Sequence, residues 1–491
     1  MNGEASLYNT TVRTGRRMQT LEFTTTLDAA PDTVFRWHAR PGAFERLVPP
    51  WVPVRLEEFE GIGEGDRAVL RMGPGPLALR WVAEHHDVIE GRQFCDRQVQ
   101  GPFAHWDHTH RFEPIDGGGC RLVDRIEYAL PAGGLGAAVA PHLVEPALRR
   151  QFAYRHRVTR HDLRRHRRYD AEAAPRTVAV SGTSGLVGSQ LVPFLTTGGH
   201  TVRRLVRARP VADDEILWNP ASGEVEAEKL NDVDAVIHLA GENVVGLWTA
   251  AKKRRIRDSR VHGTRLLAEA LAELDDPPST FVSASAVGYY GDRGAEVVTE
   301  TTPSGEGFLA AVCRAWEDAT APAAEAGIRT LQARIGVVLS PAGGALQIQW
   351  PLFWLGLGGT VGRPEQYVPW VALDDVVGGL YHLVMDEGRE GAVNLTAPTP
   401  ARMDRYAETL GTVLGRPTPL HVPPALLRGL LGELAEEMAL KSARVVPDRL
   451  RHDGYTFAYP ELEPALRHVL GRDAAGSEAP TPGPQFPSES R

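Results

Sequence analysis

The chain has 491 residues, which is room for about three domains. Hydrophobic residues make up 42% and charged residues 24%, ordinary proportions for a globular protein, and the net charge of −8 argues against a general nucleic-acid-binding protein. Lysine is rare, which limits where a catalytic lysine can be; the lysines are Lys229, Lys252, Lys253 and Lys441.

The three cysteines, Cys95, Cys120 and Cys313, form no Cys-x-x-Cys pair and no metal-spaced group. Such a sparse, odd number is typical of a reducing compartment, so we expect a cytoplasmic protein. Residues 1–17 are polar, and Arg16–Arg17 precede no apolar run, which predicts a disordered leader and no signal peptide. No stretch is long and apolar enough to predict an integral membrane segment.

Residues 18–168 are predicted to form an α+β domain in which an antiparallel sheet grips a long helix. An early helix is expected at 30–37 and a long final helix at 141–168. Alternating segments between turn signals predict strands at 19–27, 54–59, 66–72, 77–86, 93–99, 105–112 and 120–129. Domains of this kind usually enclose an apolar cavity.

Two segments carry a family resemblance for this region: AAPDTVFRWHARPGAFERLVPPW, and the strand pair HWDHTHRFEP with CRLVDRIEYALP. They resemble the START-like, polyketide-cyclase (SRPBCC) domains. The resemblance implies a domain at 18–168 that binds a hydrophobic small molecule or lipid.

His105, His108 and His110 raise the question of a metal site. Strand alternation places His108 and His110 on one face with Trp106 and Phe112, and His105 on the other. No cysteine or carboxylate nearby in the sequence completes a ligand set, so we predict polar groups lining or flanking a cavity, and no metal. The many arginines of 148–168 are interpreted as the solvated face of the final helix.

A linker is expected at 169–175, followed by a nucleotide-binding domain at 176–400. Its opening, RTVAVSGTSGLVGSQLVPFLTTGGHTVRRLVR, predicts a strand, a glycine turn, a helix and a second strand. Gly182, Gly185 and Gly188 recur every three residues. This is the context in which a dinucleotide pyrophosphate lies on a helix N-terminus.

The end of the second strand bears on which dinucleotide is bound. An NAD site places an acidic residue about twenty residues beyond the glycines, where it holds the ribose 2′-hydroxyl. Here Arg207 and Arg209 occupy that region, and the first acid is Asp213. Arginine suits a 2′-phosphate, so the sequence favours NADP(H) over NAD(H).

Further strands at 234–239, 280–285, 330–339 and 393–396, alternating with helices, predict a doubly wound parallel sheet of the Rossmann type. The series GTSGLVG, LVR, HLAGEN, RDSRVHGTRLL, SASAVGYYGD and RIGVVLS resembles the extended short-chain dehydrogenase/reductase superfamily. LAGEN, IRDSR and SAVGYYGD are similar to its YfcH-type, epimerase-like branch. Residues 401–471 resemble the C-terminal module of that branch.

The resemblance assigns roles to individual positions. It implies that Gly182, Thr183, Ser184, Gly185, Leu186, Val187 and Gly188 hold the pyrophosphate, that Arg207 meets the 2′-phosphate, and that Leu239, Ala240 and Gly241 pass beside the adenosine ribose. Ser285 matches the hydroxyl that hydrogen-bonds the reacting carbonyl or alcohol.

The chain departs from the superfamily at its acid/base pair. Tyr-x-x-x-Lys is expected on the helix after the serine strand, but GFLAAVCRAWEDA offers Phe308 or Leu309 at the tyrosine position and Val312 or Cys313 at the lysine position. No tyrosine of the chain has a lysine four residues later. Tyr289, Lys253 and Glu242 are candidate substitutes; packing, surface or ion-pair roles are the alternatives for them.

Three features complete the chain. Asp374 and Asp375, in WVALDD, are expected to cap a helix at 376–385. A helix at 423–439 carries a leucine stripe that we interpret as packing over a substrate cleft. Residues 472–491 have a composition that predicts a disordered tail.

Two functions stay open from the sequence. The first is an NADP-dependent oxidoreductase or epimerase-like enzyme that acts on a carbonyl or alcohol of a small substrate. A hydrophobic substrate is one option. The alternative is a catalytically impaired NADP-binding sensor or hydrophobic-ligand-binding protein. The missing Tyr-x-x-x-Lys favours the second, whereas the glycine loop, Arg207 and Ser285 favour the first, or at least cofactor binding.

Overall fold

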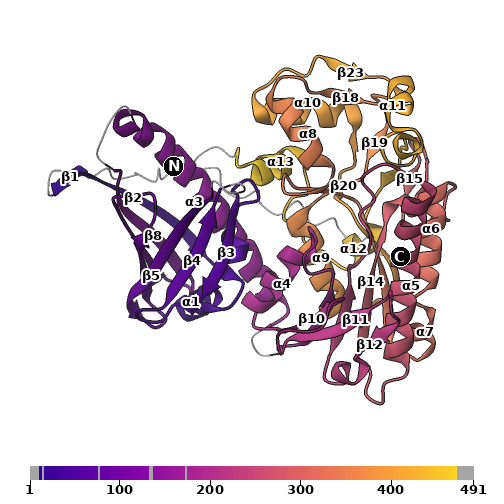
Figure 1. Cartoon of the computed structure of the whole chain (residues 1–491), viewed down its shortest axis with the longest axis horizontal. Coiled ribbons are helices and arrows are strands. Elements are labelled where there is room, and N and C mark those ends of the chain that lie inside the picture. Colours follow the sequence, from indigo (N-terminus) through magenta and orange to yellow (C-terminus); the bar gives the residue numbers. More distant parts are fainter. Residues whose placement is uncertain are drawn as a thin grey trace. The chain divides into compact units, whose positions relative to one another are not determined.

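The computed structural model describes residues 10–13, 16–73, 75, 78–131, 136–171 and 174–472. These residues fall into two compact units, one largely within Met1–Ala174 and one largely within Pro175–Arg472 (Figure 1). The fold class expected from the sequence, a helix-grip domain followed by a Rossmann-type domain, is confirmed.

The N-terminal unit is an antiparallel sheet packed against a long helix (Figure 1). Its strands follow the order β1-β2-β8-β7-β6-β5-β4-β3. They are β1 (Thr10–Arg13), β2 (Arg16–Leu27), β3 (Val54–Phe59), β4 (Arg67–Met72), β5 (Leu79–Ile89), β6 (Gln93–Gln100), β7 (His105–Pro114) and β8 (Cys120–Ala129), and the helices are α1 (Pro31–Ala39), α2 (Ala43–Leu47) and α3 (Gly136–Arg168).

Side-chain alternation builds the core of this unit. Along β7 every second residue from Trp106 to Phe112 is buried, because successive strand residues point to opposite faces. The aromatic rings of Phe23 and Phe152 stack at 4.7 Å between centroids, and this contact holds α3 against β2.

Several expectations for this unit need correction. The short helix α2 was not predicted, and the expected disordered leader of 1–17, much of which lies outside the described residues, contains β1 and the start of β2. The arginines of α3 are not all solvated. Arg155 donates to the carbonyl oxygen of Leu47, and burial lowers its pKa, while Asp162 forms a buried 2.8 Å ion pair with Arg46.

The C-terminal unit contains a sheet of order β12-β11-β10-β9-β13-β14-β16-β21, parallel apart from the short β12. Chain order along the parallel strands is 3-2-1-4-5-6-7, the doubly wound arrangement. The strands are β9 (Thr177–Ser181), β10 (Thr201–Val206), β11 (Glu215–Asn219), β12 (Glu224–Val225), β13 (Ala235–His238), β14 (Thr280–Ala286), β16 (Arg329–Ile335) and β21 (Gly391–Leu395).

Helices and short turns accompany this sheet (Figure 1). The helices are α4 (Gly188–Thr197), α5 (Ala250–Ala272), α6 (Phe308–Asp318), α7 (Ala321–Glu325), α9 (Leu373–Met385) and α12 (Asp448–His452), with 3₁₀ turns η2 (Ala227–Leu230) and η3 (Val287–Tyr290). Helix α13 (Leu462–Leu470) packs against α10 (Met403–Leu414). Strand β11 was missed by the sequence analysis.

A smaller lobe of the C-terminal unit lies beyond the sheet (Figure 1, orange to yellow). It contains α8 (Gly344–Trp354), α10 (Met403–Leu414), α11 (Pro424–Leu431), the π-helical turn η4 (Ala435–Ala439) and the strand pairs β18 (Gly359–Val361) with β23 (Leu420–Val422) and β19 (Tyr367–Val368) with β22 (Ala401–Arg402). Two further parallel pairs are β15 (Val297–Val298) with β24 (Arg444–Val445) and β17 (Val337–Leu339) with β20 (Trp370–Ala372).

Glycines divide two elements that were expected to be continuous. The strand at 330–339 is split between β16 and β17 at Gly336, where a Cβ would lie 2.4 Å from the carbonyl oxygen of Pro369. The helix at 423–439 breaks at Gly432, whose φ of 57° is readily adopted by glycine. Within the leucine stripe, Leu427 is buried, whereas Leu426, Leu430 and Leu431 are 51%, 70% and 48% exposed. Packing over a substrate cleft stays a prediction.

Asp374 and Asp375 lie in the first turn of α9 and bond to the segment 458–468, so neither is the N-cap residue of that helix. Helix α9 begins at Leu373 without a side-chain cap. The Asp375 carboxylate accepts the backbone N–H groups of Ala458 at 2.7 Å and Tyr459 at 2.9 Å, and Asp374 pairs with His468 at 3.0 Å.

Within the described residues, no helix is long and apolar enough to cross a membrane. The expected tail at 472–491 lies outside the described residues apart from Arg472.

Candidate active site

The glycine-rich loop joins β9 to α4 at the carboxyl edge of the parallel sheet. Gly182 has φ +69°, and a Cβ there would lie 2.9 Å from the backbone nitrogen of Ala240. A Cβ at Gly188 would lie 2.3 Å from the carbonyl oxygen of Gly182. The backbone therefore approaches itself as closely as glycine allows, and α4 begins directly after this turn, so the positive end of its dipole faces the loop.

Ser181 and His238 tie β9 to β13, the two strands between which the chain order reverses. The Ser181 hydroxyl oxygen accepts the N–H groups of Leu239 at 3.0 Å and Ala240 at 3.2 Å, so its own proton goes to His238 Nδ1 at 2.7 Å. Burial lowers the pKa of His238 to about 3, which keeps the imidazole neutral. This bond holds the segment starting at Leu239 beside the glycine loop.

Arg207 follows β10, the next strand along the sheet edge. Its side chain is exposed and forms no ion pair within the described residues. Arg204, by contrast, is held by Asp214 at 2.6 Å. Arg207 and Arg209 are thus exposed cations near the end of β10 that form no ion pair within the described residues.

Ser285, at the end of β14, belongs to a buried polar network. Its hydroxyl donates to Glu317 Oε1 at 2.6 Å. Arg334, on the neighbouring strand β16, donates to both oxygens of Glu317, at 2.8 Å from Nε and 2.7 Å from Nη2. Burial opposes the Arg334 charge, but the Glu317 carboxylate raises the pKa of this guanidinium above its usual range.

Helix α6 carries Glu317 and shows what replaces the usual acid/base pair. A Cβ built on Gly288, beside the end of β14, would contact Leu309 Cβ at 3.5 Å and Cys313 Sγ at 3.8 Å. Leu309, Cys313 and Glu317 are four residues apart, so they share one helix face. Burial raises the pKa of Cys313 to about 12, which keeps it a neutral thiol. Glu317 is the ionisable carboxylate on this face.

The two tyrosines after Ser285 have different environments. The Tyr289 ring lies under the Arg334 guanidinium, 3.5 Å from ring centroid to Cζ. Tyr290 is buried; its hydroxyl donates to Asn394 at 2.7 Å and accepts from Arg334 at 2.9 Å. Burial raises the pKa of Tyr290 to about 12. Tyr289 is therefore the more accessible of the two.

Lys253 and Glu242 form ion pairs. Lys253 Nζ lies 2.8 Å from Glu433, which follows α11 in the C-terminal module, and 5.0 Å from the Phe308 ring centroid. Glu242 pairs with Lys252 at 2.8 Å, and this bond lowers the pKa of Glu242. These contacts match the ion-pair alternative raised by the sequence.

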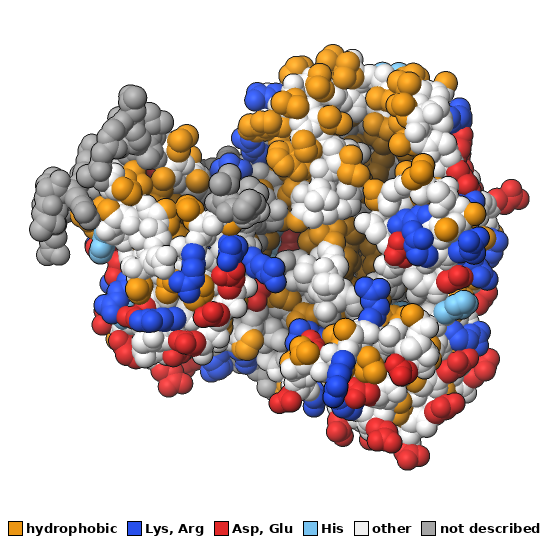
Figure 2. Space-filling view, in the orientation of Figure 1, with side chains coloured by type: hydrophobic (Ala, Val, Ile, Leu, Met, Phe, Trp, Pro, Cys, Tyr) orange, Lys and Arg blue, Asp and Glu red, His pale blue; other side chains and the backbone are white. Residues whose placement is uncertain are grey.

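The fold gathers most of the predicted cofactor residues at one edge. Residues 182–188, Arg207 and Leu239–Glu242 follow the strands β9, β10 and β13, and Ser285 lies at the end of the adjacent strand β14. Glu317 and Arg334 were missed by the sequence analysis. For Glu317 a signal was present, because it lies eight residues after Leu309 and therefore on the same face of α6. Figure 2 shows that the surface of the C-terminal unit is hollowed between its lobe and its sheet, with hydrophobic side chains lining the hollow.

Comparison with known proteins agrees with this geometry. The model of the NAD-dependent epimerase/dehydratase family matches residues 178–395. An epimerase family protein of Mycobacterium bovis is 42% identical over 296 residues, which cover 60% of this chain and 98% of that protein. The chain belongs to the NAD-dependent epimerase/dehydratase family.

Two solved structures resemble this NAD(P)-binding member of the family. A nucleoside-diphosphate sugar epimerase from Corynebacterium glutamicum is 33% identical, with a TM-score of 0.77, and the match covers 93% of this chain and 91% of that one. The human epimerase family protein SDR39U1, solved with NADPH, is 31% identical, with a TM-score of 0.55, and the match covers 60% of this chain and 98% of that one.

The epimerase-family region is flanked by two other matches. A polyketide cyclase/dehydrase and lipid transport model matches residues 18–154, which identifies the N-terminal unit as a domain of that type. A domain of unknown function, DUF1731, matches residues 422–469, within the predicted C-terminal module.

Proposed function

We propose that the C-terminal unit is an NADP(H)-dependent oxidoreductase or epimerase-like enzyme of the YfcH-type branch, acting at a carbonyl or alcohol carbon of a small substrate. The observation that carries the proposal is the glycine loop. Neighbouring backbone atoms lie so close to Gly182 and Gly188 that neither position has room for a Cβ. Such a cradle fits a dinucleotide pyrophosphate. When bound, the nicotinamide supplies or accepts the hydride.

The preference for NADP(H) rests on Arg207. A 2′-phosphate is best met by a guanidinium with free donors, and Arg207 is exposed without an ion-pair partner within the described residues. The human relative was solved with NADPH, in agreement with this choice.

We assign the proton step to Ser285 and Glu317. Since the Ser285 hydroxyl donates to Glu317, a lone pair of Oγ is left to accept the proton of a substrate alcohol. As hydride leaves the carbinol carbon, that proton moves to Ser285 Oγ and the serine proton moves to Glu317; reduction reverses both transfers. Arg334 positions the carboxylate.

The second candidate, an NADP(H)-binding sensor without turnover, is favoured by a different observation. Ser285 is only 3% exposed, and the α6 face carries Leu309 and Cys313 where the usual acid/base pair would stand. In that case the Ser285–Glu317–Arg334 network is purely structural, and the N-terminal unit binds the hydrophobic ligand that its family resemblance implies.

Cofactor binding is tested by titrating the full-length protein with NADPH and NADH and following nicotinamide fluorescence. Loss of one charged hydrogen bond costs about 1.5–3 kcal/mol, so Arg207→Ala should weaken NADPH binding at least tenfold and leave NADH unchanged. Arg405→Ala, in an exposed ion pair with Glu408 on α10, is the matched control. Equal affinities for both cofactors in the wild type would contradict the preference.

Turnover separates the two candidates. A panel of carbonyl compounds is screened for NADPH oxidation by the wild type, Ser285→Ala and Glu317→Gln. The enzyme proposal expects wild-type turnover that falls by about 10²-fold or more in both variants while NADPH binding is kept. Turnover that is unchanged in Ser285→Ala removes the proton role. NADPH binding without any turnover supports the sensor.

A further inference from the structure

A group of imidazoles and carboxylates lies inside the N-terminal unit, on the sheet face that packs against α3. Asp96 comes from β6, His108 and His110 from β7, Asp124 from β8 and His156 from α3. Strand register brings them together, because Asp96 lies opposite His108 and Asp124 lies opposite His110. The sequence analysis placed the two histidines on one face but did not find the carboxylates, which lie on adjacent strands.

Asp124 contacts one nitrogen of each of the two imidazole rings, His108 and His110. Its Oδ1 accepts a hydrogen bond from His108 Nε2 at 3.2 Å and lies 2.7 Å from His110 Nδ1. Its Oδ2 is bonded to His156 Nε2 at 2.6 Å. Asp124 is almost fully buried, so its carboxylate is satisfied by these imidazoles.

Asp96 faces the other nitrogen of each of these two rings. Its Oδ2 lies 3.1 Å from His108 Nδ1 and 3.7 Å from His110 Nε2. If His108 carries its proton on Nε2 and His110 carries its proton on Nδ1, the nitrogens that face Asp124, then His108 Nδ1 and His110 Nε2 present lone pairs toward Asp96 Oδ2. Two acceptors cannot face each other in a buried site without a positive charge between them, which either the second proton of an imidazolium or a metal ion supplies.

The separations suit a shared metal ion. Metal–ligand bonds of 2.0–2.1 Å put neighbouring ligand atoms about 3.0 Å apart in octahedral and about 3.4 Å apart in tetrahedral geometry. One atom each from Asp96, His108 and His110 lie within 4.8 Å of one another. A carboxylate behind metal-bound imidazoles, as Asp124 stands here, is the usual partner that orients such ligands.

We propose that Asp96 Oδ2, His108 Nδ1 and His110 Nε2 bind one divalent first-row transition metal ion inside the N-terminal unit, with Asp124 as the positioning residue for both imidazoles. Two histidines and one carboxylate leave coordination positions open for water or for an oxygen atom of the domain's ligand. The site is independent of the nucleotide site.

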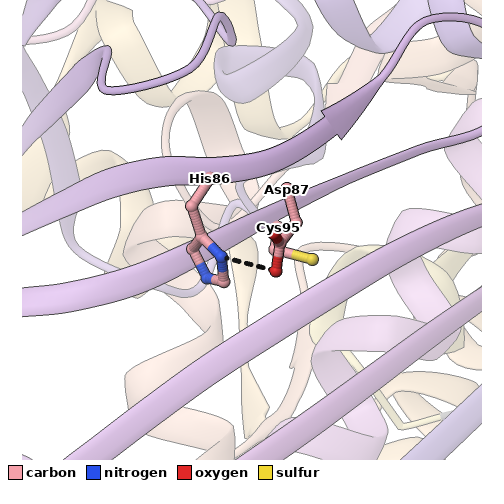
Figure 3. A group of neighbouring side chains, drawn as sticks. All are labelled: His86, Asp87 and Cys95. Atoms are coloured by element: carbon pink, nitrogen blue, oxygen red, sulfur yellow. Dashed lines mark hydrogen bonds and ion pairs between the residues drawn. The ribbon is translucent and has the colours of Figure 1, made fainter.

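A second group in the same unit serves as an internal comparison. His86, Asp87 and Cys95 are neighbours (Figure 3), but His86 is bonded to Asp87 at 3.1 Å and to Asp107 at 3.1 Å. The Asp87 side chain is 74% exposed, and burial raises the pKa of the Cys95 thiol, which disfavours the thiolate that a metal would need. We expect no metal there.

The test uses full-length protein stripped with a chelator and titrated with Co²⁺, whose visible absorption reports nitrogen and oxygen coordination, and with Zn²⁺ in competition. We expect one ion per chain. Asp96→Asn and His108→Gln should weaken Co²⁺ binding at least tenfold, as should Asp124→Asn through its effect on the rings. His86→Gln is the matched control and should bind like the wild type.

Circular dichroism shows whether each variant is folded. If a single substitution unfolds the unit, ¹⁵N spectra of the wild-type imidazoles provide the second measurement, because metal binding shifts His108 and His110 and leaves His86 unchanged. No stoichiometric Co²⁺ binding by the folded wild type overturns the proposal, and so does binding that is lost in His86→Gln but kept in Asp96→Asn. Protonated imidazoles would then carry the balancing charge.

Discussion

The pair formed by Arg334 and Glu317 predicts a large effect for a nearly isosteric change. Glu317→Gln removes the charge that faces a guanidinium whose side chain is 5% exposed, and it turns one side-chain oxygen into an N–H₂ group facing a donor. Breaking a buried pair from one side costs about 3–5 kcal/mol. Since the Glu317 side chain is itself 12% exposed, the lower end, about 3 kcal/mol, applies.

This free energy translates into a melting shift. The C-terminal unit spans about 300 residues, so at about 2.1 cal/mol/K per residue its unfolding entropy is about 0.6 kcal/mol/K and the expected loss in Tm is about 5 °C. Differential scanning calorimetry of the full-length protein measures it, and the relevant transition is the one that NADPH raises. Ser285→Ala, which removes one hydrogen bond to the same carboxylate, should cost about 1 kcal/mol, or about 2 °C.

A double variant makes the test sharper. Glu317→Gln combined with Arg334→Gln should lose less than the sum of the two single changes, because the residues are in direct contact. If Glu317→Gln melts within 1 °C of Ser285→Ala, or if the two single losses simply add, Arg334 does not depend on this carboxylate and the reasoning is refuted.

Three other predictions follow from single contacts. Gly188→Ala puts a Cβ 2.3 Å from the carbonyl oxygen of Gly182, so it should lower the free energy of unfolding by about 1–3 kcal/mol or more and abolish tight NADPH binding. Gly429→Ala, whose Cβ meets nothing within 4 Å, should be neutral or stabilising in the same melting experiments. Equal effects of the two changes would contradict the close approach at Gly188. Burial lowers the pKa of His238 to about 3, so below pH 6.5 the unfolded chain binds a proton that the folded chain does not. The free energy of unfolding should therefore fall as the pH drops from 6.5 toward 3, by about 2 kcal/mol at pH 5. In denaturant unfolding measured against pH, His238→Asn should flatten this slope, and an unchanged slope would assign it to other groups. Asp375→Asn weakens the acceptor of two backbone N–H groups, so hydrogen exchange at Ala458 and Tyr459 should quicken at least tenfold, while protection equal to the wild type would show that the carboxylate charge is dispensable.

Local pattern predicted the fold class and most of the long elements of this chain, although it missed α2 and β11. Strand alternation predicted the bounds of β3 and β8, and the glycine spacing predicted the turn between β9 and α4, because side-chain period and glycine conformation are properties of short segments. The same local logic placed Arg207 at the end of β10, whereas the missing Tyr-x-x-x-Lys was identified from the family resemblance. Periodicity left the role of the leucine stripe open, since an apolar helix face does not specify what covers it, and Leu426, Leu430 and Leu431 are exposed.

Tertiary structure determined which polar side chains from different helices and strands lie in contact. Glu317 reaches Ser285 only because α6 packs beside β14, with Arg334 paired to the same strand from β16. Asp96 and Asp124 reach His108 and His110 only through the register of three antiparallel strands. Sequence alone determined which elements form and which of their faces are polar, whereas only packing and register, which join residues far apart in the chain, determined which polar groups share a site.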